Sequence, residues 1–105
     1  MELRRVVITG IGTVNPLGNS VDEYWNNLVN GVSGAGPITH FDATAHKTHF
    51  ACEVKNFDAT QYMERKDIRK YDLYTQYAFV STDQAIKDSG LDLENIDGDR
   101  VGVIW

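Results

Sequence analysis

The most informative stretch of the chain is VVITGIGTVNPLG, residues 6–18. Its first three residues, Val6, Val7 and Ile8, are consecutive and β-branched, without the polar alternation of a half-exposed strand. This pattern predicts a strand over residues 5–11 that is buried on both faces. Such strands are typical of parallel sheets that helices cover on both sides. The sequence therefore predicts an α/β fold.

Gly10 and Gly12 at the end of this strand raise the possibility of a turn that cradles the phosphates of a dinucleotide. That motif needs a third small residue and a helix that starts at once. Here Asn15 and Pro16 follow instead, and the helix signal is delayed to Ser20. The acidic residue expected about 20 positions further on is also missing. The two glycines are therefore interpreted as positions where the backbone turns sharply and packs closely after the strand.

The first predicted helix starts after Ser20. Ser20 and Glu23 have the spacing of a capping box, in which each side chain binds a free backbone N–H of the first turn. Gly31 is a natural stop. One face of the helix is apolar and is expected to pack against the sheet; its residues are Val21, Tyr24, Trp25, Leu28 and Val29.

A second, longer helix is predicted from about residue 66 to residue 89, ended by Gly90. Its middle is apolar on more than one face, as expected of a helix sandwiched inside a larger body. A brief helical turn over residues 60–63, capped by Asp58 and Gln61, precedes it.

The remaining segments alternate between loop and strand. Residues 34–48 show no sustained period and are predicted to form an ordered loop. Alternation over residues 50–54 predicts a short strand with Phe50, Cys52 and Val54 on its buried face. The last residues, DRVGVIW, predict a second buried strand that has barely begun. Because a domain seldom stops inside a core strand, the chain is expected to be the N-terminal piece, residues 1–105, of a longer protein.

Composition sets the broad class. With 105 residues and 42% hydrophobic residues, the chain is expected to form one compact domain with its own core. The net charge of −5 argues against nucleic acid as a general partner. No apolar run approaches the roughly 18 residues of a membrane span, and no signal-peptide pattern is present. A cytoplasmic location is therefore expected. The single cysteine excludes internal disulfides and fits a reducing compartment.

His46, His49 and Cys52 suggest a metal site by their spacing, H-x-x-H-x-x-C. Structural zinc needs four ligands and catalytic zinc at least three converging ones, and His40 or Asp42 would complete the set only by chance. A mid-strand cysteine also lacks the positive surroundings that activate a nucleophilic thiolate. Surface histidines and a small buried thiol are therefore favoured over a metal site or a catalytic cysteine.

A basic cluster stands out from the acidic background. Residues 64–70, ERKDIRK, carry four basic and two acidic residues, so the segment is +2 and the remainder is −7. Lys66, Arg69 and Lys70 have the i, i+3, i+4 spacing that places three like charges on one helical face, and they lie in the first turns of the predicted long helix, where the helix dipole favours acids. Two interpretations remain open: a solvated face relieved by Glu64 and Asp67, or a docking patch for an acidic partner.

Four stretches together carry a resemblance to a known family. They are RRVVITGIGTVNPLGNSVDEYWNNLVNGVSG at residues 4–34, ITHFDA at 38–43, EVKNFDA at 53–59 and RKDIRKYDLYTQYA at 65–78. In this order they closely resemble the N-terminus of β-ketoacyl-acyl-carrier-protein synthase II, the elongating condensing enzymes of bacterial fatty acid synthesis. The resemblance covers essentially all 105 residues.

The resemblance implies the thiolase fold, of which this chain would be the N-terminal part of the first half. It also implies an acyltransferase: an acyl chain moves to an active-site cysteine, and malonyl-carrier protein loses CO₂ and attacks the thioester. The family's cysteine and two catalytic histidines match none of His40, His46, His49 or Cys52. No catalytic, cofactor-binding or metal-binding residue is therefore expected in this chain, and residues 1–105 alone are expected to be inactive.

The resemblance also implies partners. Lys66, Arg69 and Lys70 align with basic positions that contact the acidic face of acyl carrier protein, which carries the substrates on its phosphopantetheine arm, and no other cofactor is implied. A homodimer is implied for the full-length protein, with neither nucleic acid nor membrane as a partner. A non-catalytic synthase relative or a polyketide-type synthase remains the alternative.

Overall fold

Helices make up most of the regular structure of the chain. The computed structural model describes all of residues 1–105. The elements, in chain order, are α1 (Val21–Val29), β1 (Gly36–Pro37), β2 (Phe50–Ala51), the short 3₁₀ helix η1 (Ala59–Gln61), α2 (Arg65–Ile68), α3 (Leu73–Ser89) and the 3₁₀ helix η2 (Gly98–Arg100). None of the helices has the length and apolar character needed to cross a bilayer.

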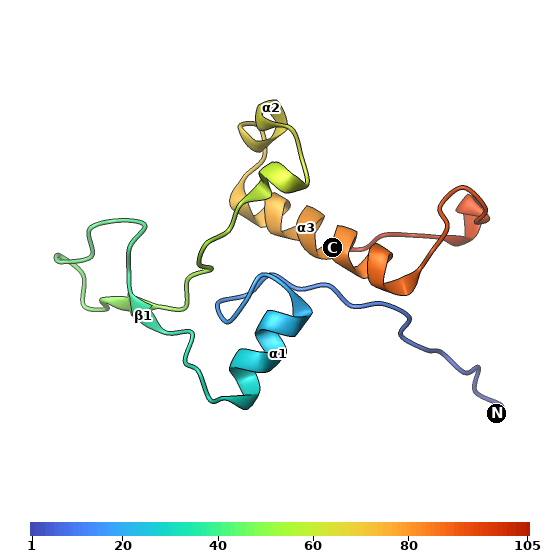
Figure 1. The fold of residues 1–105 in the computed structure, drawn as a ribbon, viewed down its shortest axis with the longest axis horizontal. Coiled ribbons are helices and arrows are strands. Elements are labelled where there is room, and N and C mark those ends of the chain that lie inside the picture. Colours follow the sequence, from blue (N-terminus) through green and yellow to red (C-terminus); the bar gives the residue numbers. More distant parts are fainter.

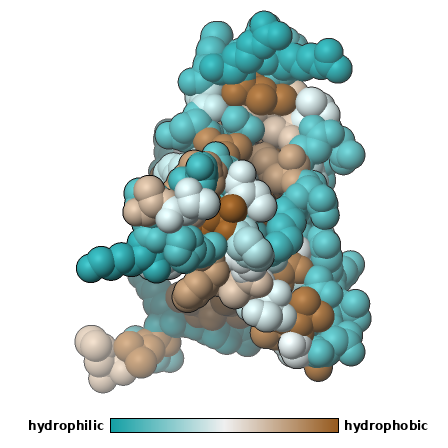
Figure 2. All heavy atoms as spheres, turned by 90° about the vertical axis from the view of Figure 1, so that its left-hand side faces the viewer, coloured by the Kyte–Doolittle hydropathy of each residue, from teal (hydrophilic) through white to brown (hydrophobic).

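The arrangement of these elements is open (Figure 1). The radius of gyration is 17.5 Å, whereas a compact domain of this length would have about 13 Å. Only six of 105 residues are buried, and the apolar ones among them are Ala43, Ala59 and Val80. Figure 2 shows hydrophobic side chains lying open at the surface among hydrophilic ones. The expectation of a compact domain with its own core is therefore wrong for this chain.

The two predicted buried strands, residues 5–11 and the C-terminal run, are not formed. Both segments are irregular, and their side chains are open to solvent, with Val6 88% exposed and Ile104 98% exposed. A strand needs a neighbour to accept and donate its backbone hydrogen bonds. Within residues 1–105 neither segment has such a neighbour, because the only sheet is the β1–β2 pair.

The predicted close packing at Gly10 and Gly12 is confirmed. Both glycines lie against α3: a Cβ added at Gly12 would overlap the carbonyl oxygen of Ser81 and would lie 2.8 Å from the backbone nitrogen of Ala85. A Cβ at Gly10 would lie 2.6 Å from the backbone nitrogen of Ser89. The absence of side chains at these positions lets the N-terminal segment cross the helix in direct backbone contact.

Polar side chains then fasten the following turn, residues 13–19, to the rest of the molecule. The Thr13 amide donates to Gln84 Oε1 at 3.0 Å, and Gln84 Nε2 donates to the Asn19 carbonyl oxygen at 2.7 Å. Asn19 Nδ2 in turn donates to the Lys55 carbonyl oxygen at 2.8 Å. The turn is thus tied both to α3 and to the segment after β2.

Helix α1 begins and ends as predicted. Ser20 Oγ accepts from the Glu23 amide at 3.2 Å, and Glu23 Oε2 accepts from the amide of Asn19 rather than from that of Ser20. Gly31, just beyond the helix, has a φ of 68°, a conformation that glycine adopts without strain. The apolar face, however, is not packed on a sheet: Trp25 is 62% exposed.

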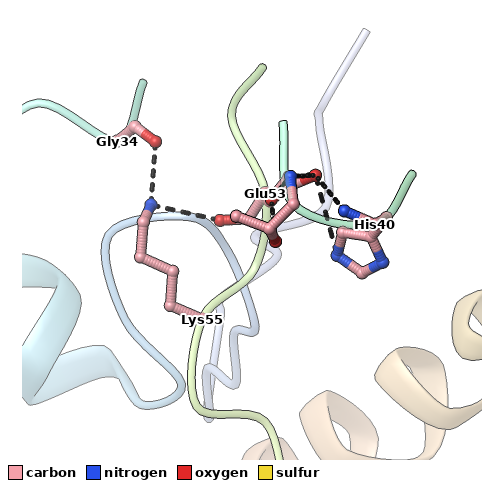
Figure 3. Close-up of polar contacts among 5 residues, drawn as sticks. Gly34, His40, Glu53 and Lys55 are labelled. Atoms are coloured by element: carbon pink, nitrogen blue, oxygen red, sulfur yellow. Dashed lines mark hydrogen bonds and ion pairs between the residues drawn. The ribbon is translucent and has the colours of Figure 1, made fainter. Parts of the chain in front are cut away.

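The loop predicted over residues 34–48 contains one departure, because β1 pairs with β2 in an antiparallel ladder with Gly36 opposite Ala51. The predicted strand over residues 50–54 is shorter than expected, and Phe50 and Cys52 are exposed instead of buried. The reason is Glu53 (Figure 3), whose carboxylate accepts from Thr39 Oγ1 at 2.8 Å and from the His40 amide at 3.3 Å. This draws the Glu53 face inward and turns Cys52 outward.

The predicted long helix is divided into α2 and α3. Asp72 interrupts it by accepting from the Thr75 amide at 2.8 Å, as the N-cap of α3. The predicted stop at Gly90 is confirmed, with a φ of 66°. Only one side of α3 is covered in this chain, because Val80 is buried while Phe79 is 54% exposed. The helix is therefore not sandwiched here.

The brief turn predicted before α2 is also present. Asp58 is its N-cap and accepts from the Thr60 amide at 2.9 Å, and the turn begins one residue earlier than predicted.

Candidate functional site

Lys66, Arg69 and Lys70, named here the cationic patch, lie on α2 and on the turn that follows it. Lys66 is within α2, and the Arg69 backbone keeps right-handed helical angles at the C-cap. The Lys70 amide donates to the Asp67 carbonyl oxygen at 2.9 Å, which continues the helical turn. The Lys66 and Lys70 side chains are 68% and 66% exposed. The cationic patch is therefore accessible to a partner.

The division of the long helix changes the electrostatic setting of the cationic patch. The sequence predicts these cations in the first turns of a long helix, where the dipole opposes them. In the structure α2 ends at Ile68, so Arg69 and Lys70 follow a helix C-terminus instead. Cations are favoured at that end. The predicted dipole penalty is therefore wrong for Arg69 and Lys70, whereas Lys66 still lies in the first turn of α2. The repulsion among the three cations remains unfavourable.

Two of the three cations are paired with neighbouring acids. Lys66 Nζ lies 2.9 Å from Glu64 Oε2, and Lys70 Nζ lies 3.7 Å from Asp67 Oδ1. Arg69 forms no ion pair. Part of the positive charge of residues 64–70 is therefore already compensated within the segment, and Arg65 and Arg69 carry the uncompensated part.

Gln76 anchors the cationic patch to α3. Its buried side-chain amide donates to the Ile68 carbonyl oxygen at 3.1 Å and to the Tyr71 carbonyl oxygen at 2.8 Å. These carbonyls have no helical partner because α2 has ended, so Gln76 satisfies them. Gln76 is not among the residues predicted from the sequence, although an amide in the mainly apolar stretch of residues 71–80 indicates a buried polar contact.

On its other side α2 contacts η1. Hydrogen bonds from the Thr60 hydroxyl and amide hold the pKa of Asp58 below its usual range, with a smaller contribution from the nearby Arg65 guanidinium. The ionised Asp58 cap thus keeps η1 in place beside α2. The segment that carries the cationic patch is therefore held by hydrogen bonds from Gln76 and also packs against η1.

The alternative metal site receives no support from the geometry. No group of three or more His, Cys, Asp or Glu side chains is placed to hold a metal ion. His46 packs edge-on against Phe41, with ring centroids 5.6 Å apart, and Cys52 is exposed. His46, His49 and Cys52 therefore do not form a common site.

The largest groove, of about 450 Å³, lies between the N-terminal segment, α3 and the last residues of the chain. Its lining has no acidic, basic, histidine or cysteine side chain, and consists of Thr9, Gly10, Gly12, Ser81, Thr82, Ala85, Ile86, Ser89, Gly102, Val103, Ile104 and Trp105. General acid–base or nucleophilic chemistry with an ionisable group is therefore not available there.

Comparison with known sequences places the chain among condensing enzymes. Residues 3–105 match the profile described as Beta-ketoacyl synthase, N-terminal domain. The 3-oxoacyl-acyl-carrier-protein synthases 2 of Vibrio harveyi and of Coxiella burnetii are each 50% identical over 103 residues, and that of Synechocystis is 41% identical over 104 residues. These matches cover 98% or 99% of this chain, which spans about a quarter (25%) of the length of those relatives.

Solved structures agree with this assignment. One, described as the ishigamide ketosynthase/chain length factor, is 35% identical with a TM-score of 0.79, and the match covers 89% of this chain and 23% of that one. Another, a type II polyketide ketosynthase in complex with its acyl-carrier protein and bound to the hexaketide, is 26% identical with a TM-score of 0.66, over 90% of this chain and 23% of that one. The α/β, thiolase-like fold class predicted from the sequence is confirmed.

Proposed function

This chain belongs to the β-ketoacyl synthase family, and we propose on that basis that the protein carrying it is a 3-oxoacyl-acyl-carrier-protein synthase of the elongating type. The observation that carries the proposal is the identity of 41% to 50% with synthases of that name over nearly all of this chain. The reaction class is acyl transfer with decarboxylative condensation in fatty acid elongation.

In the proposed reaction a cysteine thiolate, supplied outside residues 1–105, attacks the thioester of the acyl-carrier protein. The acyl group moves to the cysteine, and the carrier thiol leaves. Malonyl-carrier protein then loses CO₂, and the carbon that keeps the electron pair attacks the acyl-cysteine thioester. The cysteine thiolate leaves, and the product is a 3-oxoacyl thioester two carbons longer. No resident cofactor is needed, because the carrier's phosphopantetheine arm presents both substrates.

The cationic patch is the part of this chain to which we assign a role, the docking of acyl carrier protein. The segment of residues 64–70 is +2 within a chain of net charge −5, and the three cations of the cationic patch are exposed. An acidic carrier surface would be steered toward it and oriented by it. The complex of a related ketosynthase with its carrier protein supports this class of partner.

The proposal extends to the complete protein in three further respects. We extend it to a homodimer, which the family resemblance implies, and to a cytoplasmic location. The open apolar segments, residues 6–8 and 101–105, become strands when further strands of the complete protein lie beside them. Their exposure in this chain supports this assignment, because contiguous apolar surface of this kind marks an interface.

A second candidate is a polyketide-type synthase or a non-catalytic relative. It is favoured by the likeness to a ketosynthase/chain length factor, at 35% identity. Fatty acid elongation is better supported, since the 3-oxoacyl synthases are 41% to 50% identical. Purified full-length protein given malonyl- and acyl-carrier protein separates the two. Elongation by two carbons supports the first candidate, and products extended repeatedly without reduction, or no product, support the second.

The docking role is tested by reversing the charges of the cationic patch in the full-length protein. Binding of holo-acyl-carrier protein to the Lys66→Glu, Arg69→Glu, Lys70→Glu triple variant is expected to be weaker by about tenfold or more at low salt, because loss of attraction and new repulsion act together. The measurement is surface plasmon resonance or fluorescence anisotropy over a salt series.

Lys47→Glu is the control for each of the three charge reversals in the triple variant. It makes the same change in net charge at an exposed position in the loop before β2. Binding by the control is expected to stay close to that of the unaltered protein. Equal affinity of the triple variant and the unaltered protein at low salt, with circular dichroism unchanged, would rule out the docking role.

A further inference from the structure

Two acidic side chains lie beside the lysines of the cationic patch and are paired with them. Glu64 Oε2 lies 2.9 Å from Lys66 Nζ, and Asp67 Oδ1 lies 3.7 Å from Lys70 Nζ. Arg69 is exposed and forms no ion pair. The three cations are therefore not equivalent toward an incoming acidic surface, although their spacing in the sequence makes them look alike.

We propose that Glu64 and Asp67 are affinity-setting residues that compete with an acidic partner for Lys66 and Lys70, and that Arg69 is the leading anchor of the cationic patch. This inference rests on the proposed docking of acyl carrier protein. It assigns to the two carboxylates the function of weakening the binding of acyl carrier protein, which the cations of the same segment attract.

The competition follows from charge and distance. A partner carboxylate that binds Lys66 must displace Glu64, and it then lies beside that displaced anion, which repels it. The Glu64 side chain is 72% exposed, so its pair with Lys66 is weak and exchanges readily with a partner. The result is a moderate affinity and a fast release, which suits a carrier that must leave after each transfer.

Arg69 differs from the lysines in two ways. It has no internal anion to displace, and its planar guanidinium binds a carboxylate through two parallel hydrogen bonds, whereas an ammonium acts as a point charge. Its backbone lies at the C-cap of α2, next to Ile68, whose carbonyl oxygen accepts a hydrogen bond from the Gln76 side chain. Arg69 is therefore ready to bind before either lysine is released.

The two carboxylates are not needed to form α2. Glu64 occupies the N-cap position, but its side chain makes no capping hydrogen bond. The Asp67 contribution to the turn is its backbone carbonyl, which accepts from the amides of Lys70 and Tyr71. Glu64→Gln and Asp67→Asn keep the shape of each side chain and remove only its charge, so both variants are expected to fold.

The experiment measures affinity and dissociation rate of holo-acyl-carrier protein on the full-length protein at low and high salt. Glu64→Gln and Asp67→Asn are each expected to bind about two- to fivefold more tightly at low salt, mainly through slower dissociation. The gain is expected to vanish near 1 M salt, where the screening length is about 3 Å. Among the variants that neutralise a cation, Arg69→Gln is expected to lower the affinity about tenfold. Lys66→Gln and Lys70→Gln are each expected to lower it about two- to threefold.

Glu94→Gln is the matched control, because it makes the same change in net charge at an exposed residue beyond the opposite end of α3. The 17 residues of α3 separate the two places by about 25 Å, well over a screening length. Its affinity is expected to match that of the unaltered protein.

The outcomes separate the inference from the proposed function. If the lysine and arginine variants weaken binding but Glu64→Gln and Asp67→Asn bind no tighter than Glu94→Gln, docking stands and the competition is overturned. If Lys66→Gln loses as much affinity as Arg69→Gln, the leading role of Arg69 is overturned. If none of the three cation variants weakens binding, the proposed docking itself fails, and the inference fails with it.

Discussion

The turn of residues 13–19 and the apolar segment of residues 6–8 are neighbours in sequence and opposites in structure. In the turn, the side chain of Gln84 contacts Thr13 and Asn19 at 3.0 Å and 2.7 Å, although the buried Asn19 Oδ1 has no hydrogen-bond partner. In the apolar segment, Val7 is 64% exposed and Ile8 is 83% exposed. The same contrast recurs at the other end of the chain, where Val103 is 79% exposed.

The difference shows which forces act locally. A hydrogen bond is satisfied by one well-placed partner atom, and residues 1–105 supply such atoms at the N-caps of α1, η1 and α3. Burial of an apolar strand needs a surface on both faces and a neighbouring strand on each edge. No segment of this chain supplies those surfaces, so the turn is formed and the strands are not.

The largest effect is expected at the contact between the turn and α3. In the full-length protein Gly12→Ala should lower the free energy of unfolding by about 3 kcal/mol, because the new Cβ overlaps the backbone of α3 and backbone gives way less easily than a side chain. Urea unfolding measures it. Gly36→Ala is the control: nothing lies within 4 Å of its added Cβ, so a change within about 0.5 kcal/mol is expected. Equal losses in both variants would contradict the packing described here.

A smaller effect is expected from the polar link itself. Gln84→Ala leaves the Thr13 amide and the Asn19 carbonyl without their partner, which should lower the free energy of unfolding by about 2 kcal/mol. Thr82→Ala, on the same helix, touches neither group and serves as the control. If Gln84→Ala unfolds at the same urea concentration as the control, the turn is held by other contacts.

The smallest effect is expected when the pH is lowered and the N-cap Asp72 is protonated. Hydrogen bonds from the Thr75 amide and hydroxyl lower the pKa of Asp72 in the folded state. Since the folded pKa lies below the unfolded value of about 3.9, the cap's contribution to stability is fully present above that value and is lost as the pH falls through the folded pKa. Helical circular dichroism of α3 should therefore weaken below about pH 4. Asp72→Asn, which also caps helices well, should reduce this pH dependence and leave the signal at pH 7 nearly unchanged. An identical acid profile for both proteins would exclude Asp72 as its source.

Much of the local structure could be predicted from sequence. The Ser20 cap, the Gly31 and Gly90 stops and the Asp58 turn all depend on residues within four positions of one another, so their spacing carries the information. The break at Asp72 was missed because the apolar pattern continues across it, although an aspartate three residues before Thr75 is a typical N-cap arrangement.

The candidate site was predicted in part. Its cations could be found by charge pattern, and Glu64 and Asp67 were the expected acids beside them. Which acid pairs with which cation, and that Arg69 has none, depends on side-chain positions around one helical turn. The anchoring by Gln76 depends on where α2 ends, which the sequence pattern placed incorrectly.

By itself the sequence determined the α/β class, the caps and stops of the helices, the close-packing glycines and the place of the cationic patch. The caps and stops depend on residue type and short spacing, because a cap or a glycine turn acts through atoms a few bonds away. The tertiary structure alone decided that Gly12 lies on the backbone of α3, that Glu53 turns Cys52 outward, and that Val6 to Ile8 stay open. Those outcomes depend on which distant surfaces are available to meet, and residue order along a single strand or helix carries no record of that.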